Sequence, residues 1–337
     1  MKAHYQLVIN LALVALLLVY AIPMLYAVPT ADDYCSGVYQ HLGFVEFILY
    51  YAKLYTGRLG AVALMYFTPL AGSPVSYSFG LLACWAFLIF SIFLFSYKLF
   101  SKPEISTTFA LLFSCCYMAC LINPSETLYW FTGVATYTVA VSFVFCLLGF
   151  MQFKTNVLIA LMCMVLGFII PLFSELFIIP LLFLLCYINI KKAVFSLHLR
   201  VNARYALVGL VTGTALFACM PGNWVRLDQY HNNLNLFSAA GTALFYSIIF
   251  IFRISFHPVM IISLFLIAIY IDEIKQHTKL REIKGQLPYN GAMFLIFMAC
   301  FIPAFFTGIL GQHRTIDAVI PFVIFLFWYW VFLLSWD

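Results

Sequence analysis

The chain has 337 residues, of which 65% are hydrophobic and only 9% are charged. Soluble domains contain about 45–50% apolar and about 25% charged residues, so this composition excludes an ordinary water-soluble protein and predicts a membrane protein. The formal net charge of +5 comes from Lys and Arg gathered in a few loops. This pattern orients a protein in a bilayer and gives no support for nucleic-acid binding.

Long apolar segments predict an all-α, polytopic integral membrane protein. Backbone groups in lipid must be satisfied within helices or closed barrels, and these segments are too long for barrel strands. We expect helices near residues 6–27, 58–71, 77–97, 106–122, 133–151, 156–173, 176–190, 205–220, 236–252, 254–271, 291–310 and 316–334. The first segment is expected to remain as a signal anchor, with cleavage near Ala31 as the alternative. Residues 1–337 are expected to form a single transmembrane domain with short extracytoplasmic loops.

The basic loops predict which side of the membrane each segment faces. The N-terminus and residues 98–102, 151–156, 191–204 and 275–284 carry most of the Lys and Arg, which places them in the cytoplasm. Alternation of sides then requires an odd number of crossings within 58–97 and within 236–271, although each stretch holds two apolar segments. One segment of each pair is therefore expected to be re-entrant, interfacial or merged into a tilted helix, which gives roughly ten to twelve transmembrane helices.

The first polar feature in chain order is the pair Asp32–Asp33, directly after the first predicted helix. A carboxylate here could be the general base toward an acceptor hydroxyl. The pair could also hold a divalent metal, Mg²⁺ or Mn²⁺, against a phosphate. The alternative is a solvated acidic loop end.

The next segment, 42–55, is rich in aromatic residues and is predicted to be a helix lying in the membrane interface. Arg58 follows this helix and opens an apolar segment. Its guanidinium could clamp a phosphate through two parallel hydrogen bonds, which a lysine could not reproduce. The alternative is an arginine that reaches to the lipid headgroups.

Two carboxylates in the middle of the chain are also candidates. Glu126 lies close to Tyr129 and Trp130, and the three could form a sugar-stacking platform with a carboxylate for hydroxyl groups, or ordinary interfacial aromatics. Glu175 interrupts two apolar segments with no adjoining cation. Because a carboxylate at that depth is costly, we expect it to face a polar cavity or to pair with an arginine.

Two later turns carry basic residues. Pro221-Gly222-Asn223 predicts a tight turn that holds Arg226 at the membrane surface, where it could meet a phosphate or Glu175. Between the last two predicted helices, His313 could be a pH-sensitive donor and Arg314 a further phosphate contact. The alternatives are a turn at Pro221-Gly222 that only ends a helix and a solvent-exposed turn at His313.

Other chemistry finds no support in the sequence. The ten cysteines lie almost all within apolar segments, without a CxxC pair or a Cys/His cluster, so neither zinc nor a disulfide framework is predicted. No GxGxxG or Walker loop is present, which leaves nucleotide binding unsupported.

Taken together, these motifs resemble those of polytopic glycosyltransferases of the C-type (GT-C) fold. Asp32-Asp33-Tyr34 resembles the acidic motif that the family carries in its first loop. The resemblance extends over essentially the whole chain to bacterial membrane glucosyltransferases of the serotype-converting type. It is carried further by Gly57-Arg58, Tyr129-Trp130 with Gly133 and Tyr137, Glu175, and Pro221-Gly222-Asn223 with Arg226.

The resemblance implies transfer of a sugar from a polyprenyl-phosphate carrier to a glycan or lipid acceptor of the cell envelope, on the extracytoplasmic face of the bacterial inner membrane. By this resemblance Asp32 or Asp33 is the acceptor-side base, with or without a metal. The carrier phosphate is held by Arg58, Arg226 and Arg314. The other expected substrate-binding residues are Glu126, Tyr129, Trp130, Tyr137, Glu175, Asn223 and His313. The short first loop and the lack of a large soluble extracytoplasmic domain depart from the family and leave the acceptor unspecified.

Two other functions compete with this one. An O-antigen or capsule polymerase or ligase would also use outward-facing arginines and a lipid-linked sugar, but would need less from an acidic first loop. A transporter or flippase of lipid-linked sugars would distribute ionisable residues through both leaflets and break helices near the midplane. The crowding of polar residues on one predicted face favours a transferase over a transporter.

Overall fold

The computed structural model describes residues 2–30, 32–67, 74–100, 102–190, 195–230, 245, 249, 252–277 and 317–334. Within these ranges the chain forms helices and no strand, which confirms the all-α class. The predicted segment 291–310 and nearly all of 236–252 lie outside the described residues. The total of ten to twelve transmembrane helices therefore stays a prediction.

Several helices are suited to a membrane. Within the described ranges, four are long and apolar enough to cross one: His4–Tyr26, Val75–Leu99, Phe131–Phe150 and Leu197–Cys219. Three shorter apolar helices accompany them: Val157–Phe173, Glu175–Ile190 and Pro258–Asp272. These lengths and compositions support the predicted membrane protein, because about 20 apolar residues in a helix match the hydrocarbon thickness.

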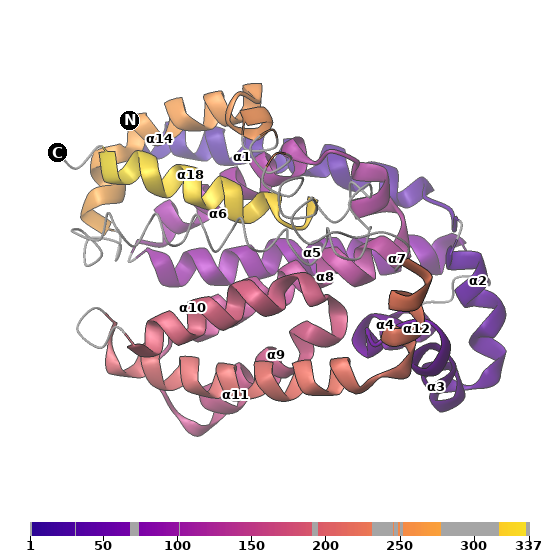
Figure 1. Cartoon of the computed structure of the whole chain (residues 1–337). Coiled ribbons are helices and arrows are strands. Elements are labelled where there is room, and N and C mark those ends of the chain that lie inside the picture. Colours follow the sequence, from indigo (N-terminus) through magenta and orange to yellow (C-terminus); the bar gives the residue numbers. More distant parts are fainter. Residues whose placement is uncertain are drawn as a thin grey trace.

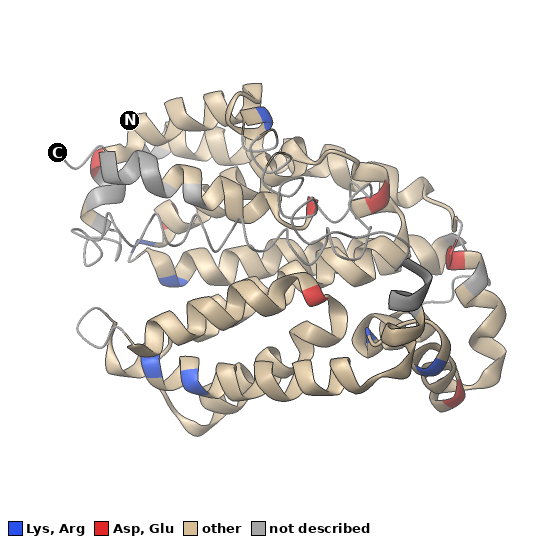
Figure 2. Ribbon diagram, viewed as in Figure 1, with Lys and Arg blue, Asp and Glu red and all other residues tan. Residues whose placement is uncertain are grey.

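The long helices lie side by side as a bundle (Figure 1). The bundle consists of α1 (Lys2–Ala21), α5 (Pro74–Leu99), α6 (Pro103–Cys120), α8 (Val139–Phe150), α9 (Val157–Phe173), α10 (Ile178–Ile190), α11 (Leu197–Cys219), α14 (Pro258–His277) and α18 (Ile320–Leu334). Four shorter helices gather at one end of it: α2 (Asp32–Tyr39), α3 (Phe44–Leu54), α4 (Leu59–Phe67) and α12 (Pro221–Tyr230). Charged residues are few, and long stretches of the ribbons carry none (Figure 2).

The core runs through α6 and α8. The apolar window of Phe131–Phe150 is 83% buried, whereas that of His4–Tyr26 is only 22% buried, so α8 is central and α1 is peripheral. Aromatic side chains fill the space beside α6: the Trp328 ring lies 5.1 Å from Phe109 and 5.5 Å from Phe113, centroid to centroid. The exposed apolar face of α1 suits lipid contact.

The region after the first helix is helical rather than an extended loop. Helix α3 confirms the helix predicted at 42–55. Helix α4 has nine described residues, and at about 1.5 Å per residue this is far short of a membrane crossing. The residues that follow it, 68–73, lie outside the described part of the chain, so the expectation that one of the two apolar segments within 58–97 does not cross stays a prediction.

Helices α9 and α11 approach each other closely through glycine. A methyl group placed on Gly209 would lie 1.9 Å from the carbonyl oxygen of Met164. Gly209→Val is therefore expected to force these helices apart and to destabilise the protein by about 1–3 kcal/mol. Thermal unfolding in detergent measures this loss. Ala215→Val, on the exposed side of the same helix, is the matched control and is expected to change little.

Candidate functional site

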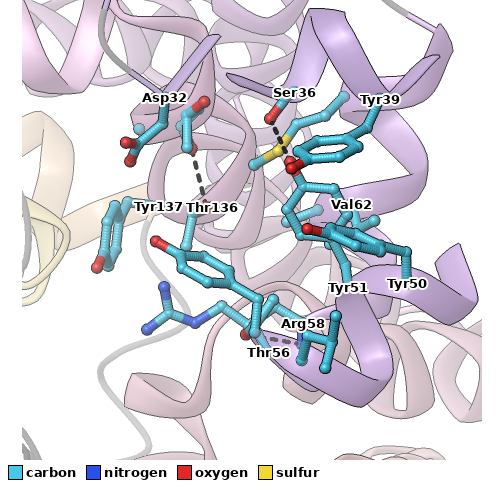
Figure 3. A pocket seen from close by; sticks show the side chains of 16 residues that line it. Asp32, Ser36, Tyr39, Tyr50, Tyr51, Thr56, Arg58, Val62, Thr136 and Tyr137 are labelled. Atoms are coloured by element: carbon cyan, nitrogen blue, oxygen red, sulfur yellow. Dashed lines mark hydrogen bonds between the residues drawn. The ribbon is translucent and has the colours of Figure 1, made fainter. Parts of the chain in front are cut away.

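A cavity of ≈ 310 Å³ opens among α2, α3, α4 and the segment that leads into α8. That segment comprises α7 (Phe131–Gly133) and a π-helical turn, η4 (Val134–Thr138). Wide turns of this kind are frequent at functional sites. In Figure 3, Asp32 and Tyr137 lie on one side of the cavity with Arg58 beneath them, and Ser36, Tyr39, Tyr50 and Tyr51 lie on the other.

The two adjacent aspartates have different environments. Asp33 is fully buried, and its carboxylate accepts hydrogen bonds from the Tyr77 hydroxyl (2.6 Å) and from both the backbone N–H (3.0 Å) and the hydroxyl (2.6 Å) of Thr132. The backbone N–H of Thr30 is a further donor at 3.3 Å. Asp32 is half-buried, lines the cavity, and has no hydrogen-bond partner for its carboxylate among the described residues.

Asp33 therefore does not face the cavity, but holds in place a segment that forms part of the cavity wall. The Tyr77 hydroxyl, which donates to Asp33, also accepts from the backbone N–H of Phe131 (3.0 Å). Asp33 and Tyr77 thus fix the start of the segment Phe131–Thr138, which carries Tyr137 into the cavity. A carboxylate that bonds two backbone segments far apart in sequence is a strong local constraint.

Arg58 and Glu175 form the ion pair that the sequence analysis gave as one alternative for Glu175. The Arg58 Nε donates to Glu175 Oε2 (2.7 Å) and Nη2 donates to Oε1, which is a bidentate contact. The guanidinium also lies over the Tyr137 ring, 5.6 Å from its centroid. Burial by itself would lower the pKa of the Arg58 guanidinium, but the charge of Glu175 and the neighbouring Tyr137 outweigh burial and raise this pKa.

Helix α12 fixes the loop that presents Arg58. The Asn223 side chain accepts from the backbone N–H of Gly57 (2.7 Å) and donates to the carbonyl of Phe217 (2.6 Å). Gly222 packs against the end of α3, where a methyl group would lie 2.5 Å from the backbone nitrogen of Thr56. Asn223, which the sequence analysis proposed as a substrate contact, instead holds the backbone next to Arg58.

Asn223→Ala is expected to lower stability by about 1–2 kcal/mol, because it leaves the buried N–H of Gly57 without its acceptor. Asn223→Asp keeps an acceptor oxygen for Gly57 but sets its second oxygen against the carbonyl oxygen of Phe217, so it should also lose stability. Thermal unfolding measures the loss in both variants. Val225→Ala, an exposed position on the same helix, is the control, and an equal loss there would contradict the assignment.

The predicted platform of Glu126, Tyr129 and Trp130 does not lie in the cavity lining. The Tyr129 hydroxyl donates to the carbonyl of Tyr20 (3.2 Å), and the Trp130 indole N–H donates to the carbonyl of Thr30 (3.2 Å). Tyr129 therefore ties its segment to the end of α1, and Trp130 ties it to the residues just before α2. One carboxylate oxygen of Glu126 is buried without a hydrogen-bond partner among the described residues.

Three predicted basic residues cannot be placed at the cavity. Arg226 belongs to α12, but its side chain lies outside the described part of the chain. His313 and Arg314 both lie in the stretch 281–316, which is also outside it. Asp317, which follows them, accepts from the backbone N–H of Ile122 (2.7 Å) and from the Thr127 hydroxyl (2.6 Å). It thereby anchors residues 122–127 to the start of the segment that leads into α18.

The geometry does not fit the metal site expected at Asp32–Asp33. Both oxygens of the buried Asp33 carboxylate accept hydrogen bonds and Asp33 does not line the cavity, so it is not available to share a metal ion with Asp32 there. Across the described residues no group of three or more His, Cys, Asp or Glu side chains is placed to hold a metal ion.

Sequence reasoning missed the tyrosines of α2 and α3 and the threonines of the opposite wall. The missed lining residues are Tyr39, Tyr50, Tyr51, Thr132 and Thr136. The only signal for Tyr50 and Tyr51 was the aromatic richness of 42–55, which equally suits a helix in the membrane interface, and Tyr39 lies before that segment. Thr136 lies within the helix predicted at 133–151 and Thr132 directly before it, and neither carried a signal.

No family model, curated protein or solved structure matches this chain.

Proposed function

We propose that the protein is a multi-pass membrane glycosyltransferase with a GT-C-like arrangement of helices. It moves a sugar from a polyprenyl-phosphate carrier to a glycan or lipid acceptor of the cell envelope, at the extracytoplasmic face of the bacterial inner membrane. The observation that carries the proposal is the Asp32 carboxylate, which lines a cavity with polar and aromatic walls and has no hydrogen-bond partner among the described residues.

Asp32 is the proposed general base. The acceptor hydroxyl gives its proton to the Asp32 carboxylate while the acceptor oxygen forms a bond to the anomeric carbon of the sugar. The bond between that carbon and the phosphate oxygen breaks, and its electrons leave with the prenyl phosphate. A carboxylate that accepts no other hydrogen bond is available for this proton, whereas that of Asp33 is occupied.

The carrier phosphate needs positive charge near the sugar. Arg58 lines the cavity, but its charge is compensated by Glu175, and only the N–H groups that Glu175 and Tyr137 leave can contact a phosphate. We propose that Arg226 and Arg314 supply the remaining charge. An O-antigen or capsule polymerase or ligase, which would also use outward-facing arginines, predicts instead that Asp32→Asn and Asp33→Asn each leave activity intact while Arg226→Ala abolishes it.

The transferase proposal is tested with the purified full chain in lipid nanodiscs, supplied with polyprenyl-phosphoryl glucose, galactose or mannose and a mixture of cell-envelope glycans. The readout is release of free prenyl phosphate, which is expected only with the matching donor. Absence of release with every donor, together with counterflow of the sugar lipid across proteoliposomes, would establish a transporter instead.

A further inference from the structure

The side of the cavity opposite Asp32 is a cluster of tyrosines, which we call the tyrosine wall: Tyr39, Tyr50 and Tyr51. The rings of Tyr39 and Tyr50 are stacked, with centroids 4.5 Å apart and an angle of 28° between their planes. The Tyr51 ring meets Tyr50 edge to face at 5.7 Å. The wall therefore presents ring faces and edges to the cavity from two different helices.

Hydroxyl groups accompany these rings. The Tyr51 hydroxyl and the Ser36 hydroxyl are 3.0 Å apart, and either can be the donor. The neighbouring Tyr39 raises the pKa of the Tyr50 hydroxyl. The Ser36–Tyr51 pair can exchange its mutual hydrogen bond for bonds to a ligand, because a hydroxyl both donates and accepts.

The wall has no formal charge, since Ser36, the three tyrosines and the neighbouring Leu54 are all neutral. It is thus suited to a neutral molecule with an apolar face and a rim of hydroxyl groups. A pyranose ring has this shape: its C–H groups form the face and its hydroxyls form the edge. The cavity volume of ≈ 310 Å³ lies at the lower end of the range for ligand pockets, about 300–1,000 Å³, and suits one such ring.

We propose that the tyrosine wall is a sugar-binding subsite, in which a neutral pyranose ring stacks on the Tyr39–Tyr50 pair and its hydroxyls bond to Tyr51 and Ser36. The inference deepens the proposed function and rests on it in taking the ligand to be a sugar. The ring can come from the transferred sugar or from the acceptor glycan, which present the same chemistry to the wall.

Binding is tested without any reaction, by saturation-transfer NMR of the full chain in nanodiscs with methyl β-D-glucopyranoside and methyl α-D-galactopyranoside as probes. At least one probe should receive saturation through its ring C–H protons. Tyr50→Phe, which keeps the ring, should bind with at most a small loss. Tyr50→Leu, which keeps apolar bulk without an aromatic face, should bind at least about fivefold more weakly.

The matched control is Tyr34→Leu, an exposed tyrosine of α2 outside the cavity lining, which should bind as the wild type does. Melting temperatures of all variants identify any loss caused by unfolding, and Tyr39→Leu is a second test of the stacked pair. The subsite is refuted when the folded wild type binds neither glycoside at millimolar concentration, or when Tyr50→Leu and Tyr39→Leu both bind like the wild type.

The source of the sugar is decided by kinetics. If the wall holds the transferred sugar, Tyr50→Leu raises the KM for the lipid donor both in transfer and in hydrolysis by water. If it holds the acceptor, only the KM for the acceptor rises. Because glycoside binding is measured without a donor lipid, failure of the subsite and failure of the transferase proposal give different results.

Discussion

Asp32→Asn is expected to leave the protein folded and to slow sugar transfer by about 10²-fold to 10⁴-fold, the usual contribution of a positioned general base. The amide keeps the size of the side chain but cannot take the acceptor proton. Because the Asp32 carboxylate has no hydrogen-bond partner among the described residues, no local contact is lost and the melting temperature should hold. Prenyl-phosphate release from the lipid donor, with acceptor present, measures the rate.

The neighbouring substitution Asp33→Asn is the matched control, with the same chemical change one residue away. Here the new amide N–H₂ would face the backbone N–H of Thr30 in one orientation and the backbone N–H of Thr132 in the other, so donor would meet donor in both. We expect a loss of about 2–4 kcal/mol in the free energy of unfolding, because the site is fully buried. Full activity in Asp32→Asn, with or without loss in Asp33→Asn, would remove Asp32 from the mechanism.

Arg58→Met is expected to destabilise the protein by about 3 kcal/mol, since it leaves the Glu175 carboxylate without its counter-ion in a largely buried place. The two side chains are 10% and 21% exposed, so solvent can relieve only part of this cost. Unfolding of the purified protein by SDS titration or by heat measures the loss. Arg58→Lys should fall between the wild type and Arg58→Met, because an ammonium cannot bond both carboxylate oxygens in the same way.

The double variant Arg58→Met with Glu175→Met separates the ion pair from the general effect of each substitution. Removing both charges is expected to cost less than removing Arg58 alone, because no uncompensated charge remains. If the free energy of unfolding lost in the double variant equals the sum of the losses in Arg58→Met and in Glu175→Met, the two residues are not a coupled pair. Transfer activity should be lost in both the single and the double variant, since in each the proposed phosphate contact of Arg58 is gone.

The sequence by itself determined the class of the protein and singled out three of the side chains that line the cavity: Asp32, Arg58 and Tyr137. Composition and the lengths of apolar segments predicted an all-helical membrane protein, because backbone groups in lipid have few other ways to be satisfied. An isolated carboxylate between apolar segments predicted a cavity or an arginine partner for Glu175. The structure pairs it with Arg58, from a segment 117 residues away.

Only the tertiary structure decided which residue of each motif faces the cavity. Asp32 and Asp33 are equivalent in sequence, but successive side chains of a helix point in directions about 100° apart, so one faces the cavity and the other faces Tyr77 and Thr132. Asn223 was predicted to touch a substrate, and the fold instead places it against the backbone of Gly57. The tyrosine wall joins α2 and α3, and side chains on two separate helices meet only through packing that no local pattern encodes.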